Sequence, residues 1–163
     1  MSERLTPSDE PEIAVVGFFT VRHRLETAGG TRGEFSFPAF RSAALFRTPE
    51  GREWAFRRRR WWGGVYELRE GNRVRGTARP FGLLRRGMEI LYEGRPYKLQ
   101  PIRSWGLAWR LSDGGDVPLL EIRPKGPFRR GVRIKVLSSV DLPLVAFAYY
   151  LVYTLWRQAA AAH

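Results

Sequence analysis

The sequence predicts a mainly β protein, a closed antiparallel β-barrel with two internal repeats that encloses an apolar C-terminal α-helix. Two observations predict this fold. First, residues 50–78 match residues 93–121 at an offset of 43, and an RPxGxxRRGxxI motif then recurs at an offset of 44, ending at Ile90 and Ile134. Second, the segment 142–156 carries no charged residue. A duplicated β unit followed by a wholly apolar helix indicates a barrel whose wall is formed by the repeats and whose core is filled by the helix.

Residues 1–12 are polar, acidic and proline-containing, and we expect them to form a disordered tail. The remainder of the 163 residues is long enough for one domain, which we expect over 13–158, with 159–163 as a short C-terminal tail. The chain has no cysteine and opens without an apolar secretory signal. We therefore expect a cytoplasmic protein, and a peripheral position on the inner face of the membrane is compatible with this expectation.

From Ile13 to Ile134 short apolar alternation is broken by turn residues, which predicts antiparallel strands with one face on a core. Trp54 and Phe56, for example, alternate with polar or small neighbours. Each repeat holds about four strands, and the segments 13–24 and 34–37 add further strands. A period near 43 also fits a β-propeller blade, but two blades cannot close a propeller, whereas a closed barrel removes exposed edges. Glycine is expected to supply a positive φ at four turns: Pro49-Glu50-Gly51, Glu70-Gly71-Asn72, Glu93-Gly94 and Asp113-Gly114-Gly115.

The segment 142–158 is predicted to be the central helix. Asp141 is a suitable N-cap and Pro143 suits a first helical turn. An uncharged stretch of 15 residues makes a helix of about 22 Å, shorter than the ~30 Å core of a bilayer, so burial in protein is favoured. The alternative is a tail anchor, in which Ala159–Ala162 lengthen the span and residues 125–135 lie on the cytoplasmic side.

The two RPxGxxRRGxxI units and the tail from Val140 to Arg157 give the chain its likeness to a known group. In pattern and layout it resembles the tubby C-terminal-like superfamily, and within it the small bacterial LURP-one-related and phospholipid scramblase-like proteins. The resemblance implies a barrel of about twelve strands around the helix. Some members bind phosphoinositides and some are linked to lipid movement. No scramblase-type calcium loop is present, and Asp113-Gly114-Gly115-Asp116 lacks the ligand spacing of an EF-hand.

The formal net charge is +12, and nearly all of the positive charge is arginine. Such a field attracts phosphates on nucleic acid or on an anionic membrane, although an arginine-rich solvated surface would give the same composition. Arginine pairs with phosphate in a bidentate manner, and indole prefers the membrane–water boundary. The candidate lipid- or phosphate-binding residues are Arg57, Arg58, Arg59, Arg60, Arg85, Arg86, Arg129 and Arg130, and the candidate membrane-contact residues are Trp61, Leu83, Leu84 and Phe128.

Each of these candidates has a structural alternative. Trp62 is favoured as a core residue because its repeat partner is Trp105, and Leu84 and Phe128 would equally plug one end of a barrel. If Arg57–Arg60 lie on a strand, only alternate arginines share a face.

The sequence offers few residues that could carry out catalysis. His23 and His163 are the only histidines, and His23 lies between two arginines, where we expect a plain surface position. No nucleophile elbow, phosphate-binding loop or metalloprotease motif occurs. We therefore expect a non-catalytic protein with no cofactor and no metal site. Glu67, Glu89, Glu121 and Asp141 are expected to pair with the surplus arginines.

The predicted function is binding of anionic phospholipid headgroups at a membrane surface through arginine-rich loops. The first alternative is a nucleic-acid-binding module that uses the same basic surface, since aromatic residues beside arginine can stack on bases. The second alternative is the tail-anchored membrane protein described above.

Overall fold

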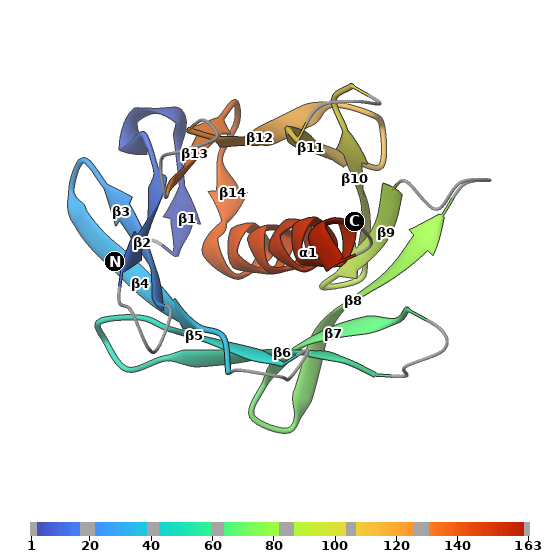
Figure 1. Ribbon diagram of the computed structural model, residues 1–163, viewed down its shortest axis with the longest axis horizontal. Helices are drawn as coiled ribbons and strands as arrows, with labels where there is room; N and C mark the ends of the chain where they lie inside the picture. The colour runs from blue at the N-terminus through green and yellow to red at the C-terminus, as the bar shows by residue number, and fades with distance from the viewer. Residues whose placement is uncertain are drawn as a thin grey trace.

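The computed structural model describes residues 3–16, 22–38, 43–59, 64–81, 87–103, 107–125 and 131–161. Twelve antiparallel strands close into a barrel around one C-terminal helix, α1 (Leu142–Ala161), as Figure 1 shows. The predicted fold class is confirmed. The wall strands are β2 (Glu12–Val16), β3 (Arg22–Thr27), β4 (Gly30–Ser36), β5 (Ala44–Arg47), β6 (Glu53–Arg58), β7 (Tyr66–Glu70), β8 (Arg73–Phe81), β9 (Gly87–Tyr92), β10 (Arg95–Pro101), β11 (Trp109–Asp113), β12 (Pro118–Pro124) and β13 (Gly131–Val136).

Consecutive strands pair along the chain, and β13 pairs with β2 to close the ring. Strands therefore alternate in direction, and the strands β2, β4, β6, β8, β10 and β12 all end at the same rim of the barrel. We call this rim the helix-exit end, because the last turns of α1 reach it. The opposite rim carries the short turns between β3 and β4, β5 and β6, β7 and β8, β9 and β10, and β11 and β12.

The internal repeat corresponds to two four-stranded units, β6–β9 and β10–β13. The strands β2–β5 form a third unit with the same pattern of pairing, which the sequence comparison did not reveal. In each unit the second and third strands change register after a leucine, and these leucines, Leu25, Leu68 and Leu111, are spaced 43 residues apart. The inward residues occupy corresponding positions in the three units but differ in residue type. A residue-by-residue comparison of the sequence with itself therefore does not detect the unit β2–β5.

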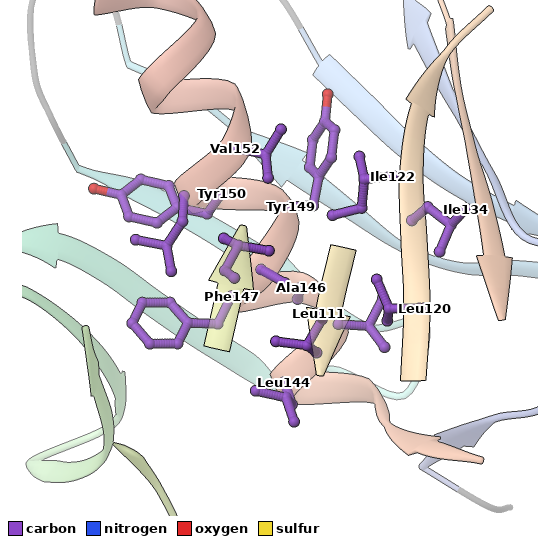
Figure 2. Close-up of a cluster of buried hydrophobic side chains, with 14 of the residues drawn as sticks. Leu111, Leu120, Ile122, Ile134, Leu144, Ala146, Phe147, Tyr149, Tyr150 and Val152 are labelled. Atoms are coloured by element: carbon purple, nitrogen blue, oxygen red, sulfur yellow. The ribbon is translucent and has the colours of Figure 1, made fainter. Parts of the chain in front are cut away.

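The wall alternates between buried and exposed residues, as expected for strands with one face on a core. Its inward side chains pack on α1, whose first eleven residues are all buried. Figure 2 shows Leu120, Ile122 and Ile134 of β12 and β13 directed at the helix, beside Ala146 and Val152. The aromatic side chains of α1 pack against rings of the wall, as in the contact of Phe56 with Tyr150, whose centroids are 5.1 Å apart.

The N-terminal residues are part of the fold, so the expected disordered tail over 1–12 is wrong for its described part. β1 (Arg4–Leu5) pairs with β14 (Val140–Asp141), and a 3-10 helix, η1 (Pro7–Asp9), leads into β2. Leu5 is fully buried in the core. A single apolar residue among polar ones gave no alternation to recognise. We refer to the β1–β14 pair as the strap, and to the rim beside it as the strap end.

Two smaller expectations need correction. The helix continues to Ala161 instead of ending at residue 158, because alanine favours helix. Glycine takes a positive φ in three of the four predicted turns, at Gly51, Gly71 and Gly94, but in the fourth turn the left-handed residue is Asp116, with φ of 63°.

Candidate functional site

Three of the predicted phosphate-binding arginines belong to the described chain, at the end of β6. They alternate between faces, as the strand geometry predicts. Arg57 and Arg59 are exposed on the outer wall, whereas Arg58 is half-buried. The other predicted site residues lie outside the described residues, together with Trp62: Arg60, Trp61, Leu83, Leu84, Arg85, Arg86, Phe128, Arg129 and Arg130.

The outer face of β6 and β7 concentrates arginine around one carboxylate. Glu67 Oε2 lies 3.1 Å from Arg57 Nε and 3.4 Å from Arg69 Nη1, and Glu67 Oε1 lies 3.5 Å from Arg59 Nε. The carboxylate is almost fully buried beneath these side chains, at 5% exposure, while Arg57 and Arg59 remain more than half exposed. We call Arg57, Arg59 and Arg69 the β6–β7 arginine cluster. One carboxylate neutralises one of three charges, so the cluster keeps a positive excess.

Elsewhere on the described wall the arginines are closer to balance. Arg47 pairs with Glu53 at 2.7 Å and Arg79 pairs with Glu89 at 3.4 Å, one cation to one anion. Glu121 accepts from Arg110 and Arg123, two cations to one anion. These hydrogen bonds hold the pKa of Glu121 below its usual value, although burial acts in the opposite direction as the largest influence. The expected pairing of Glu67, Glu89, Glu121 and Asp141 with arginine is confirmed.

Arg58 has a different environment from its two neighbours. Its guanidinium lies over the ring of Tyr66, with its central carbon 6.0 Å from the ring centroid. Its charge also acts on Tyr150 of α1, whose pKa is raised by burial and lowered in part by Arg58. The Nε atom is buried and, among the described residues, has no hydrogen-bond partner and no carboxylate. Arg58 thus adds a positive charge on the opposite face of β6 from the cluster, with no carboxylate partner among the described residues.

The C-terminal half of α1 lies at the same rim. Gln158 donates a hydrogen bond to the Tyr66 hydroxyl at 3.1 Å, and the Trp156 indole donates to the Leu107 carbonyl at 3.0 Å. Arg157 lies over the ring of Tyr153, 5.8 Å from its centroid. Since Tyr66 begins β7 and Leu107 lies two residues before β11, these bonds tie the helix end to the helix-exit end of the wall. Leu107 itself is 61% exposed.

The strand order relates this rim to both repeats. β6, β8 and β12 end here, at Arg58, Phe81 and Pro124, and β9 and β13 begin here. The predicted residues 83–86 and 128–130 follow those strand ends in the sequence but lie outside the described residues. Sequence reasoning missed Arg69. Its spacing of two from Glu67 on a strand was the available signal, since such residues share a face.

His23 is buried, so the expected surface position is wrong. It is 1% exposed and faces inward from β3, and its Nδ1 lies 2.6 Å from the Tyr149 hydroxyl of α1. The rings of Phe37 and Tyr153 pack against it, each 4.6 Å from its centroid. Burial lowers the pKa of His23 to about 4. In the first unit His23 occupies the inward position that Tyr66 and Trp109 occupy in the others, 43 residues apart each time.

In the part of the chain that the structure describes, no three histidine or carboxylate side chains gather as metal ligands would. Nor does any described helix combine the length and the hydropathy needed to cross a membrane.

No protein-family model matches this chain, and no curated protein sequence matches it. Among solved structures, the chain is similar to the X-ray structure of a protein from Arabidopsis thaliana, with a TM-score of 0.64 and 12% sequence identity. The similarity covers 92% of this chain and 93% of the plant chain. The whole barrel with its central helix is therefore shared with that plant protein at the level of fold.

Proposed function

We propose that this barrel is a non-catalytic protein that binds anionic phospholipid headgroups at a membrane surface through its helix-exit end. The observation that carries the proposal is the local charge around Glu67. Three arginines share that one carboxylate, and Arg58 on the opposite face of β6 has no carboxylate partner among the described residues. Such an excess attracts lipid phosphates by about 1 kcal/mol per basic residue near an anionic surface.

The neighbouring groups suit a membrane–water boundary. Trp156 and Leu155 are partly exposed at this rim, with Arg157 exposed beside them and Leu107 close by. Indole and arginine side chains favour the headgroup region, where an apolar body and a polar end are both satisfied. We also propose membership of the tubby C-terminal-like superfamily. A closed barrel around an apolar C-terminal helix supports that assignment, since the resemblance implies this layout.

Co-sedimentation with vesicles tests the proposal. Vesicles of phosphatidylcholine with 30% phosphatidylserine should retain the protein at low salt, and pure phosphatidylcholine vesicles should not. The double variant R57Q/R59Q should lose most of the binding, while the matched double variant R47Q/R79Q, which removes two arginines from balanced pairs, should lose much less. Equal recovery on both vesicle types rules the proposal out. Tight, salt-dependent binding of a labelled oligonucleotide without lipid preference favours the nucleic-acid alternative instead.

A gain of binding gives a sharper prediction. E67Q removes the carboxylate that neutralises the cluster, so three arginines become available to phosphate. We expect a several-fold increase in the fraction bound to anionic vesicles, with a loss of about 1 kcal/mol of stability, because the paired arginines are largely solvent-screened. E89Q, which frees only Arg79, is the control. A decrease in binding for E67Q would contradict the assignment of this surface.

A further inference from the structure

A cavity of about 730 Å³ opens at the strap end, on the opposite rim from the proposed membrane surface. Its walls come from the β9–β10 turn, the β11–β12 turn, the strap and the first turn of α1. We call it the strap-end cavity. Its volume lies within the roughly 300–1,000 Å³ that small-molecule sites occupy.

Some of the charges on its wall are already satisfied. Arg4 pairs with Asp141 at 2.5 Å, and Asp141 also accepts from the Tyr92 hydroxyl at 3.3 Å. Glu93 accepts from Arg73 at 2.9 Å and from Arg75 at 2.6 Å. These groups hold the strap and the β9–β10 turn in place.

Two further charged residues on the wall, Arg95 and Asp113, have no ion-pair partner among the described residues. Asp113 Oδ1 accepts the backbone N–H groups of Gly115 and Val117 at 2.9 and 3.0 Å, which leaves Oδ2 available. Tyr97 stands opposite Asp113 across the β10–β11 pair, and no described residue accepts or donates a hydrogen bond at its hydroxyl. Burial raises the pKa of Tyr97, and the charges of Arg95, Asp141, Arg4 and Asp113 all act on it.

The internal repeat offers a comparison for this arrangement. At an offset of 43, Arg95 corresponds to Arg52, Asp113 to Glu70, and Tyr97 to Trp54. In the earlier unit Arg52 Nη2 lies 2.7 Å from Glu70 Oε2, and Arg52 also lies over the Trp54 ring, 5.4 Å from its centroid.

In that unit Trp54 is fully buried, and Arg52 and Glu70 form an ion pair. In the later unit a tyrosine replaces the larger tryptophan, and the carboxylate side chain is one methylene shorter. Among the described residues Arg95 and Asp113 form no ion pair, and both line the strap-end cavity.

We propose that the strap-end cavity binds a small organic anion, a carboxylate or a phosphate ester that also carries a hydroxyl or amino group. Arg95 and the Tyr97 hydroxyl donate hydrogen bonds to the anionic group, because a guanidinium without a carboxylate partner is the strongest available donor to it. Asp113 Oδ2 accepts from the hydroxyl or amino group. The carbon atoms of the ligand contact Pro96, Leu119 and Leu144, which form the apolar part of the wall. This site is independent of the vesicle-binding surface.

Titrations of the full-length chain with O-phosphoserine, glycerol 3-phosphate, malate and inorganic phosphate, followed by NMR at the backbone amides of Gly114 and Gly115, test the proposal. At least one organic anion should give saturable shifts at millimolar concentration and bind at least fivefold more tightly than inorganic phosphate. The phosphate esters and malate distinguish the two anion classes. Absence of saturable shifts up to 10 mM for all four probes overturns the proposal.

Three variants refine the test. R95Q should weaken binding at least tenfold, and Y97W, which restores the residue of the earlier unit, should abolish it by filling the cavity. R79Q, which removes an arginine of the outer wall, should bind as the unchanged protein does. Retention of full affinity in both R95Q and Y97W would overturn the proposal. Thermal unfolding of each variant checks that the barrel remains folded. Vesicle binding, measured separately, should be unchanged by Y97W.

Discussion

Neighbouring residues on one strand can have opposite roles, and His23 and its two flanking arginines illustrate this. Arg22 and Arg24 pair with Glu34 on the outer wall, at 3.5 and 3.8 Å. His23, between them, faces inward and meets the Tyr149 hydroxyl. Its position could not be read from composition, because a histidine between two arginines looks polar. The alternation along β3 indicated the correct position, because His23 and Leu25 are two residues apart and so share the buried face of the strand.

The burial of His23 predicts a pH dependence of stability. The unfolded side chain has a pKa near 6.5, and in the folded protein burial lowers this pKa to about 4. Between these values the unfolded chain binds a proton that the folded chain does not. The free energy of unfolding should therefore fall as pH decreases from about 6.5 to about 4, by roughly 3 kcal/mol in total. At pH 7 and above His23 is neutral in both states, so the stability that is lost at lower pH is fully present.

Urea denaturation of the unchanged protein and of H23F at several pH values between 4 and 7 measures this term. Carboxylates also titrate in the lower part of the window, so the difference between the two proteins is the relevant quantity. H23F should show a flatter dependence on pH. Parallel curves for the two proteins would contradict the assignment of a buried, neutral histidine.

At the scale of the strand, close contact between β4 and β5 requires glycine at position 33. A Cβ added there would lie 2.2 Å from a ring carbon of Phe46 and 2.9 Å from the Arg47 carbonyl oxygen. Phe46 is fully buried between Phe35 and Trp54, so its ring has little freedom to move. We expect G33A to lower the free energy of unfolding by about 1–3 kcal/mol.

The control for this variant is G29A, in the adjacent turn, where the nearest atom to an added Cβ is the Thr27 hydroxyl at 3.8 Å. G29A should change stability by only a few tenths of a kcal/mol. Chemical denaturation compares the two variants directly. Equal destabilisation by both would show that the β4–β5 contact is looser than the distances indicate.

Elements were predictable where the pattern was long and unambiguous. The helix was expected from residue 142 because 15 successive residues carry no charge, and it begins there. The strap was not expected, since β1 and β14 contain only two residues each. Two residues cannot display a period. The strap depends instead on contacts far apart in sequence, such as Arg4 with Asp141, which no local pattern reports.

At the scale of the whole molecule, the central position of α1 predicts how its backbone exchanges hydrogen. Residues 142–152 are buried inside the wall, so their amides should exchange only when the entire barrel unfolds. Hydrogen exchange measured by NMR or mass spectrometry, on protein purified without detergent, checks this. Rapid exchange in α1 while the wall strands stay protected would mean that the helix leaves the barrel, as the tail-anchor interpretation requires.

The overall architecture was predictable, but the geometry of the proposed sites was not. The repeat and the apolar helix together indicated a filled, closed barrel. Glu67 was recognised as a partner for arginine, yet its burial beneath three of them depends on the pairing of β6 with β7. The strap-end cavity could not be predicted, because its wall combines the strap, two turns and the first turn of α1, which lie far apart in the sequence.

The position of α1 after all the wall strands in the sequence has a consequence for biosynthesis. The ribosome completes all twelve strands of the wall before it has made the segment that fills them. Until then the inward leucine, phenylalanine and tyrosine side chains have no partner in the middle of the barrel, and β2 must wait for β13 to be translated. Closure of the barrel around its core therefore cannot precede the synthesis of α1, and until then the inward apolar side chains favour aggregation.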